Sequence, residues 1–177
     1  MKKTIFHRHA PLFRAVFAFV CAILLLAGCS GAEPEPETAT PTPDLSGFGK
    51  DKNTDAQKLY AKARIMWDAA EKCSNPELAM EYLEVAITLE PEYADAYMRR
   101  ALAASELGEW DEAFDDSSKA IRLEPKADNY ALRSLVFMRE GNFKGARKDL
   151  DRALKLDPQN SRAREYIKKL GQMESAS

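Results

Sequence analysis

ITLEP at residues 87–91 returns as IRLEP at residues 121–125 and as LKLDP at residues 154–158. The prolines that end these phrases, Pro91, Pro125 and Pro158, recur at a nearly constant interval. A fixed period of about 34 residues that closes on a proline is typical of stacked helix-turn-helix repeats. The recurring phrase therefore predicts an all-α chain built from tandem helical hairpins.

The period divides the middle of the chain into three hairpins and leaves one helix after them. The hairpins occupy about residues 53–93, 94–126 and 127–160. The apolar residues that follow have the i, i+3, i+4, i+7 spacing of one helix face: Ala163, Tyr166, Ile167 and Leu170. We expect a capping helix and tail over residues 161–177, with Ser161 as the N-cap. Its apolar stripe covers the last hairpin, while Arg162 and its basic neighbours face water.

From about Tyr60 to Asn160 the chain resembles the tetratricopeptide repeat family. Small residues stand where that family's two helices cross: Ala79 and Ala86, Ala113 and Ala120, Ala146 and Ala153. Tyr97 and Tyr130 match its first-helix aromatic. Its turn glycine and the aromatic two residues later are Gly108 with Trp110 and Gly141 with Phe143. The resemblance implies a right-handed superhelix whose first helices line a groove that binds peptides or partner helices.

The first hairpin departs from the pattern at its turn and at its helix crossing. Its turn is Ser74-Asn75-Pro76 in place of glycine and an aromatic, and Trp67 stands where the family has a small residue. Asn75 suits an N-cap, and Pro76 suits the first helical position. A helix is therefore expected to begin at this turn, and an atypical repeat is common at the end of such a stack.

The register of the repeats assigns candidate positions in the peptide-binding groove. They are Arg64, Asp68 and Glu71 in the first hairpin, Met98, Leu102 and Ser105 in the second, and Ala131, Leu135 and Met138 in the third. Each set has the spacing i, i+4, i+7, which places its members on one helix face. The same spacing is equally expected of ordinary core residues, so helical periodicity leaves both the groove and the core assignments open.

Some members of the family bind C-terminal carboxylates through basic and amide side chains. At the corresponding positions Arg64 and Arg133 fit, whereas Asp68, Asp128 and Arg99 depart from the family's residues. Two of these departures are acids, which repel an acidic peptide. The resemblance therefore gives little support to a carboxylate clamp.

The second helices of hairpins two and three carry opposite charges at matching positions. Asp111 and Asp115 correspond to Lys144 and Lys148, one repeat later. These residues could form a polar docking strip. Solvated ion pairs between neighbouring hairpins, worth about 0–1 kcal/mol each, are the simpler interpretation.

The N-terminal segment predicts export and lipidation. Residues 1–14 contain four basic residues and no acid, and the apolar run Ala15–Ala27 is shorter than the roughly 20 residues of a membrane-spanning helix. The run ends in Leu26, Ala27, Gly28 and Cys29, which resemble the lipobox of bacterial lipoproteins. The resemblance implies removal of residues 1–28 and acylation of Cys29, with palmitate among the chains attached. Ser30 follows where an Asp would favour inner-membrane retention, so we expect an outer-membrane protein that faces the periplasm.

Residues 29–52 are expected to be the lipidated cysteine and an extended linker. The segment contains four prolines and four acids before Lys50 and few large apolar side chains, so it cannot form a core: Pro34, Pro36, Pro41, Pro43, Glu33, Glu35, Glu37 and Asp44. A proline-rich chain of this length reaches on the order of 60 Å. Its expected role is a spacer between the membrane and the repeats.

The composition after residue 28 excludes several kinds of site. Four basic residues and no acid leave with residues 1–28, so 22 Lys and Arg face 28 Asp and Glu, a net charge of −6. Nucleic acid is therefore an unsuitable partner. Both histidines also lie in that segment, which excludes a Ser-His-Asp or Cys-His catalytic site and a His-ligated metal. Cys73, the one remaining thiol, fits a structural role better than a redox role.

These observations predict a membrane-anchored adaptor or scaffold that binds another envelope protein, with no catalytic residues, no metal and no cofactor. Pilotins, outer-membrane assembly subunits and protease adaptors are families of similar lipoproteins. An envelope hydrolase acting on the cell wall is one alternative, although it needs two carboxylates fixed across a cleft. A purely structural spacer is the other.

Overall fold

The computed structural model describes residues 51–176, and the signal segment, the lipobox and most of the linker lie outside this range. The described residues form seven α-helices, and their only strand-like pairing is one isolated bridge between Trp67 and Cys73. The helices are α1 (Lys52–Arg64), α2 (Pro76–Leu89), α3 (Ala94–Leu107), α4 (Trp110–Leu123), α5 (Ala127–Glu140), α6 (Phe143–Leu156) and α7 (Ser161–Ala176). The predicted all-α class is confirmed.

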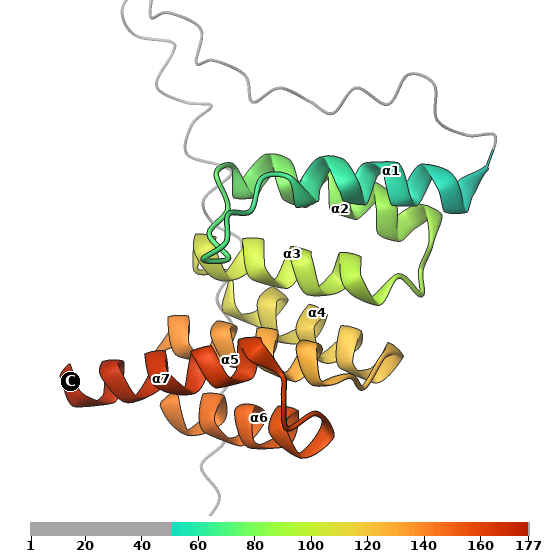
Figure 1. Cartoon of the computed structure of the whole chain (residues 1–177). Coiled ribbons are helices and arrows are strands. Elements are labelled where there is room, and N and C mark those ends of the chain that lie inside the picture. The colour runs from blue at the N-terminus through green and yellow to red at the C-terminus, as the bar shows by residue number, and fades with distance from the viewer. Residues whose placement is uncertain (1–50, 177) are drawn as a thin grey trace, which may run out of the picture. The chain divides into compact units, whose positions relative to one another are not determined.

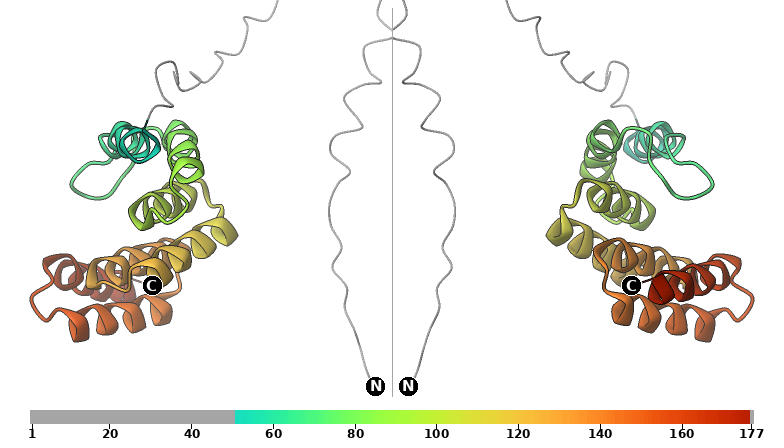
Figure 2. Two further views of the ribbon diagram at one scale, coloured as in Figure 1. Left: turned by 90° about the vertical axis from the view of Figure 1, so that its right-hand side faces the viewer. Right: turned by 90° about the vertical axis from the view of Figure 1, so that its left-hand side faces the viewer.

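The helices pair into three hairpins that stack one upon the next, as Figures 1 and 2 show. α1 packs against α2, α3 against α4, and α5 against α6. Between hairpins, α3 contacts both α2 and α5, and α7 lies against α5 and α6 at the end of the stack. The last helix therefore occupies the place that the first helix of a fourth hairpin would take.

The recurring phrase ends each second helix because of its proline. α2, α4 and α6 end at Leu89, Leu123 and Leu156, and the acid that follows has an extended backbone, with φ from −132° to −140°. A residue before proline is pushed out of the helical region by the proline ring. The phrase is thus a helix stop followed by the turn into the next hairpin.

The turns within hairpins two and three are made by glycines in the left-handed conformation. Gly108 has φ 78° and Gly141 has φ 88°, and each ends the first helix of its hairpin. In the first hairpin Asn75 caps α2, because its side chain accepts a hydrogen bond of 3.0 Å from the Leu78 N–H. This confirms the helix start predicted from Ser74-Asn75-Pro76.

Gly108→Ala should lower the free energy of unfolding by about 1–2 kcal/mol, because an L-residue at φ 78° is strained even though a Cβ there meets no atom within 4 Å. Gly171→Ala is the matched control, since Gly171 lies inside α7 and its added Cβ also meets open space. That change should raise stability by about 0.5–1 kcal/mol. Thermal melts of both variants give the measurement, and equal shifts of the same sign would contradict the assignment of Gly108 as a left-handed cap.

The six alanines predicted at the helix crossings are fully buried, and they let the paired helices approach closely. The core around them continues through all three hairpins into α7, where Ala163, Tyr166 and Leu170 are buried as the sequence predicted for a cap. Two details of α7 differ from expectation. Asn160, not Ser161, caps the helix by accepting a hydrogen bond of 2.9 Å from the Ala163 N–H. Arg162 is only partly exposed and forms an ion pair with Glu71, in the loop described below.

Ion pairs that the sequence analysis missed tie the two helices of a hairpin together. Arg100 on α3 makes two hydrogen bonds, of 2.7 and 3.0 Å, to Asp116 on α4. Arg133 and Asp149 repeat this arrangement in the next hairpin, at 2.7 and 2.9 Å. Both acids are buried, and the hydrogen bond to Asp116 raises the pKa of Arg100. Both members of the pair recur together one repeat later, which is the signal that could have identified it.

Within residues 51–176, no helix is long and apolar enough to cross a membrane. The same residues contain no group of three or more His, Cys, Asp or Glu side chains placed to hold a metal ion.

Candidate functional site

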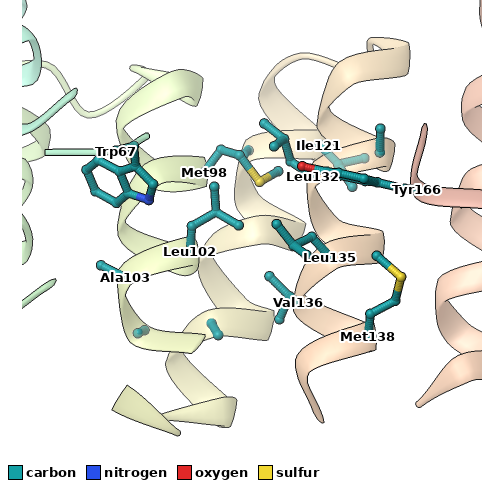
Figure 3. Packing of buried hydrophobic residues seen from close by; sticks show 14 of the residues in the cluster. Trp67, Met98, Leu102, Ala103, Ile121, Leu132, Leu135, Val136, Met138 and Tyr166 are labelled. Carbon is teal, nitrogen blue, oxygen red and sulfur yellow. The ribbon is translucent and has the colours of Figure 1, made fainter. Parts of the chain in front are cut away.

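The second- and third-hairpin positions assigned to the groove lie in the core. Met98, Leu102, Ser105, Ala131, Leu135 and Met138 are each at most 4% exposed. Figure 3 shows Met98, Leu102, Leu135 and Met138 in one cluster with Trp67 and with Tyr166 of α7, and Ala131 belongs to the same cluster. An open groove lined by these side chains is therefore corrected to a packed core, which was the other assignment that the helical spacing allowed. The physical reason is that a loop after α1 and the last helix, α7, lie over these side chains.

The loop that lies over these side chains consists of residues 65–75, and we call it the inner loop. α1 ends at Arg64, so Asp68 and Glu71 do not continue its helical face, and their predicted i, i+4, i+7 alignment with Arg64 is wrong. Instead the Asp68 side chain accepts hydrogen bonds of 2.8 and 2.9 Å from the N–H groups of Ala70 and Lys72. These bonds and the bridge between Trp67 and Cys73 fold the loop onto itself.

Trp67 shows why α1 stops early. A tight helix crossing has no room for an indole, and overpacking one costs roughly 1–3 kcal/mol. With the helix ended, the indole instead lies in the core at 6% exposure, with the Arg99 guanidinium 5.5 Å from its ring. The indole N–H is buried and has no hydrogen-bond partner among the described residues.

Glu71, at the tip of the inner loop, is the centre of the candidate site. Its backbone is in the left-handed region at φ 58°, and the residue is only 5% exposed. Its carboxylate accepts hydrogen bonds from Arg99 of α3 and, at 3.1 Å, from Nη2 of Arg162 of α7. Ion pairs to two helices therefore hold Glu71 in its left-handed backbone conformation, which costs roughly 1–3 kcal/mol.

Arg139 of α5 also binds the inner loop, through the backbone of Glu71. Its guanidinium donates hydrogen bonds of 2.5 Å to the Glu71 carbonyl, 3.0 Å to the Leu102 carbonyl and 2.7 Å to the Ser105 hydroxyl. It also pairs with Glu106 at 2.9 Å, and that carboxylate accepts a hydrogen bond of 2.9 Å from the Cys73 N–H. We call Glu71 and its three arginines, Arg99, Arg139 and Arg162, the Glu71 cluster.

The surroundings of the cluster raise the pKa of three groups, Arg99, Tyr166 and Cys73. Burial alone would lower the pKa of Arg99, but the hydrogen bond and charge of Glu71 raise it above its usual value. Burial raises the pKa of Tyr166 to about 12, and the charge of Glu71 adds to this effect. Burial also raises the pKa of the Cys73 thiol, so it stays protonated, in keeping with a structural role.

The five positions compared with a carboxylate clamp do not form one site. Asp68 closes the inner loop, Arg133 binds Asp149, and Arg99 binds Glu71. Asp128 is bound by Asn160 at 2.8 Å and by Arg162 at 3.3 Å, while Arg64 is half-buried at the end of α1. Four of the five side chains, all except Arg64, are therefore bound to other groups of the chain. This agrees with the sequence, which gave little support to a carboxylate clamp.

The charged strip on the outer helices is exposed rather than paired. Asp111 and Asp115 on α4 and Lys144 and Lys148 on α6 are all exposed, and none takes part in a salt bridge with the described residues. Ion pairs between hairpins do not form there, which leaves the strip open to solvent.

The comparisons with known proteins bear on the hairpins directly. Models of the tetratricopeptide repeat match residues 94–126 and 127–160. The second and third hairpins are tetratricopeptide repeats. The human protein called tetratricopeptide repeat protein 13 is 45% identical over 56 residues, which cover 32% of this chain and 6% of that protein. The chain thus spans a small fraction of the curated relative it matches.

Solved tetratricopeptide repeat domains share the fold over most of the described residues. The Arabidopsis OM64 TPR domain is 25% identical with a TM-score of 0.57, covering 69% of this chain and 98% of that one. The first TPR of Spaghetti (RPAP3), bound to the HSP90 peptide SRMEEVD, is 21% identical with a TM-score of 0.56, covering 70% and 95%. The first hairpin and α7 therefore belong to a tetratricopeptide-like stack, although the family models match only the two hairpins between them.

Proposed function

We propose that this chain is a lipid-anchored protein-interaction module of a bacterial envelope assembly. The observation that carries the proposal is a pair of tetratricopeptide repeats preceded by a Leu26–Cys29 segment that resembles a lipobox. Tetratricopeptide repeats mediate interactions between proteins, and a domain of the same fold holds a peptide. Partners of pilotin, outer-membrane assembly or protease-adaptor type fit this proposal, with the repeats facing the periplasm.

The carboxylates support an interaction role over the alternative of an envelope hydrolase. A glycoside hydrolase of the common kind needs two carboxylates with different protonation across a cleft. Among the described residues the buried acids are each paired with a cation of the chain: Asp55 with Lys58, Glu71 with Arg99, Asp116 with Arg100 and Asp149 with Arg133. Acids held in this way are engaged within the fold, which favours an interaction role over hydrolysis.

Cys29→Ala should move the protein out of the membrane fraction, because the lipid that we propose as the anchor is attached at that sulfur. Fractionation of cells followed by detection of the chain gives the measurement. Cys21→Ala is the matched control, since it removes a thiol from the same segment and leaves Leu26–Cys29 intact. Equal membrane association of Cys29→Ala and the unchanged chain would show that a retained apolar segment, not a lipid, anchors the protein.

A further inference from the structure

The Glu71 cluster is built like a ligand site whose ligand is part of the same chain. Its arginines come from three helices that neighbour one another in the stack, α3, α5 and α7. The group they surround comes from a loop 28 to 91 residues away in sequence. No helix of the stack supplies that carboxylate.

We propose that the inner loop is a built-in plug, and that an acidic segment of a partner protein displaces it by placing a carboxylate where Glu71 lies. The inference rests on the proposed role as an interaction module and adds the chemistry of the partner. The closed form described here is then the unbound state. The open form exposes the inner face of α3 and α5 together with the arginines.

The chemistry of the cluster selects a carboxylate. The Arg99 side chain is 7% exposed, and an arginine cannot lose its charge by deprotonation in a protein. When Glu71 withdraws, Arg99 is left as a buried cation, which is costly unless another anion replaces the lost partner. The planar guanidinium groups of Arg99 and Arg162 match the two oxygens of a carboxylate.

A route to these arginines is already open. A pocket of about 190 Å³ lies beside the cluster, and its lining includes Arg99 and Arg162 together with Tyr60, Met98 and Asp128. A side chain entering there reaches both arginines before the loop has moved. Exchange of one carboxylate for the other can therefore begin without unfolding a helix.

The inner loop is attached in a way that allows release. Of residues 65–75, only Trp67, Glu71 and Cys73 are buried. Residues 65–74 lie between the end of α1 and the Asn75 cap of α2, so their departure leaves both helices and that cap in place. Release also relieves the left-handed backbone of Glu71 and gives the unpartnered indole N–H of Trp67 access to water.

Trp67 supplies the measurement, because it is one of only two tryptophans in the chain. In the Trp110→Phe background of the full chain purified in detergent, its emission reports the inner loop alone. Titration with a hexaglutamate peptide that has blocked ends should shift this emission to the red in a saturable way. Hexaglutamine should leave it unchanged. No saturable shift with hexaglutamate, in the Trp110→Phe chain and in Glu71→Gln alike, would overturn the proposal.

Glu71→Gln in the same background tests the competition. The apparent affinity of a ligand falls by the fraction of protein in its competent form, so weakening the plug should tighten hexaglutamate binding about tenfold if the closed form predominates by about ten to one. Glu92→Gln is the control, since it removes the same charge from an exposed residue outside the cluster. Equal affinities of the two variants would show that only net charge matters and that no plug exists.

Arg162→Gln completes the test, because the Arg162 side chain is 27% exposed and its loss leaves the core in place. This variant should keep its helical circular dichroism and bind hexaglutamate at least about tenfold more weakly than Glu71→Gln, since a charge-assisted partner of the carboxylate is lost. An affinity equal to that of Glu71→Gln would exclude the cluster as the site. A chain that binds the peptide through the cluster but does not fractionate with membranes would contradict the proposed anchoring alone.

Discussion

The double substitution Leu102→Glu with Leu135→Glu is expected to unfold the repeats. The two side chains are 0% and 2% exposed and belong to the continuous core. Removing a buried leucine costs roughly 2–5 kcal/mol, and a buried carboxylate without a partner adds a further penalty. Together these costs approach the whole stability of an ordinary domain, about 5–15 kcal/mol. Circular dichroism should show loss of helix at room temperature.

The matched control places the same change on exposed leucines. Leu107 and Leu156 are 37% and 44% exposed, so Leu107→Glu with Leu156→Glu should retain the helices and a cooperative thermal transition. A folded Leu102→Glu, Leu135→Glu variant would show that these residues line an open groove, as the first of the two sequence interpretations had it. The experiment thus decides between core and groove on the residues where helical spacing could not.

The stacked hairpins were predictable because local rules and long-range packing agree there. The residue before each phrase-ending proline cannot stay helical, Gly108 and Gly141 have the left-handed backbone that suits glycine, and alanines occupy the tight crossings. Each of these signals acts within a few residues and recurs at the repeat period. Repetition made a weak local preference into a firm assignment of the fold.

The inner loop was not predictable in this way, because its structure depends on partners far along the chain. The stretch after Arg64 contains good helix formers, and helical periodicity extended α1 as far as Glu71. The one sequence feature that indicated a departure from the repeat was Trp67, which stands where the family has a small residue. What ends the helix is the gain from burying that indole and from pairing Glu71 with Arg99 and Arg162, contacts that span 28 and 91 residues.

The groove assignment failed for a related reason. A stack of hairpins alone would leave Met98, Leu102 and Leu135 exposed on its inner side. They are buried here because the inner loop and α7 lie over them. The amphipathic pattern of α7 predicted only that it covers the last hairpin. The contacts of Arg162 and Arg139 with Glu71 are polar, so the spacing of apolar residues could not predict them.

Arg139→Met is expected to lower the free energy of unfolding by roughly 3 kcal/mol, because Met keeps most of the side-chain volume but loses every hydrogen bond of the guanidinium. The Arg139 side chain is 20% exposed and joins α5 to two other parts of the chain: the inner loop at Glu71, and α3 at Leu102 and Glu106. Without it the Glu106 side chain, 14% exposed, has lost its cation. A chain of this size should then melt on the order of 10 °C lower.

Arg147→Met is the control for this change, since Arg147 is 54% exposed and its ion pair with Glu174 lies at the surface. Surface pairs contribute about 0–1 kcal/mol, so this variant should melt within a few degrees of the unchanged chain. Arg139→Met should also shift the emission of Trp67 to the red, because the inner loop loses the hydrogen bond from Arg139 to the Glu71 carbonyl. Equal melting of the two variants, with no change in Trp67 emission, would mean that the loop is held by Trp67 and the remaining arginines and that Arg139 fastens nothing.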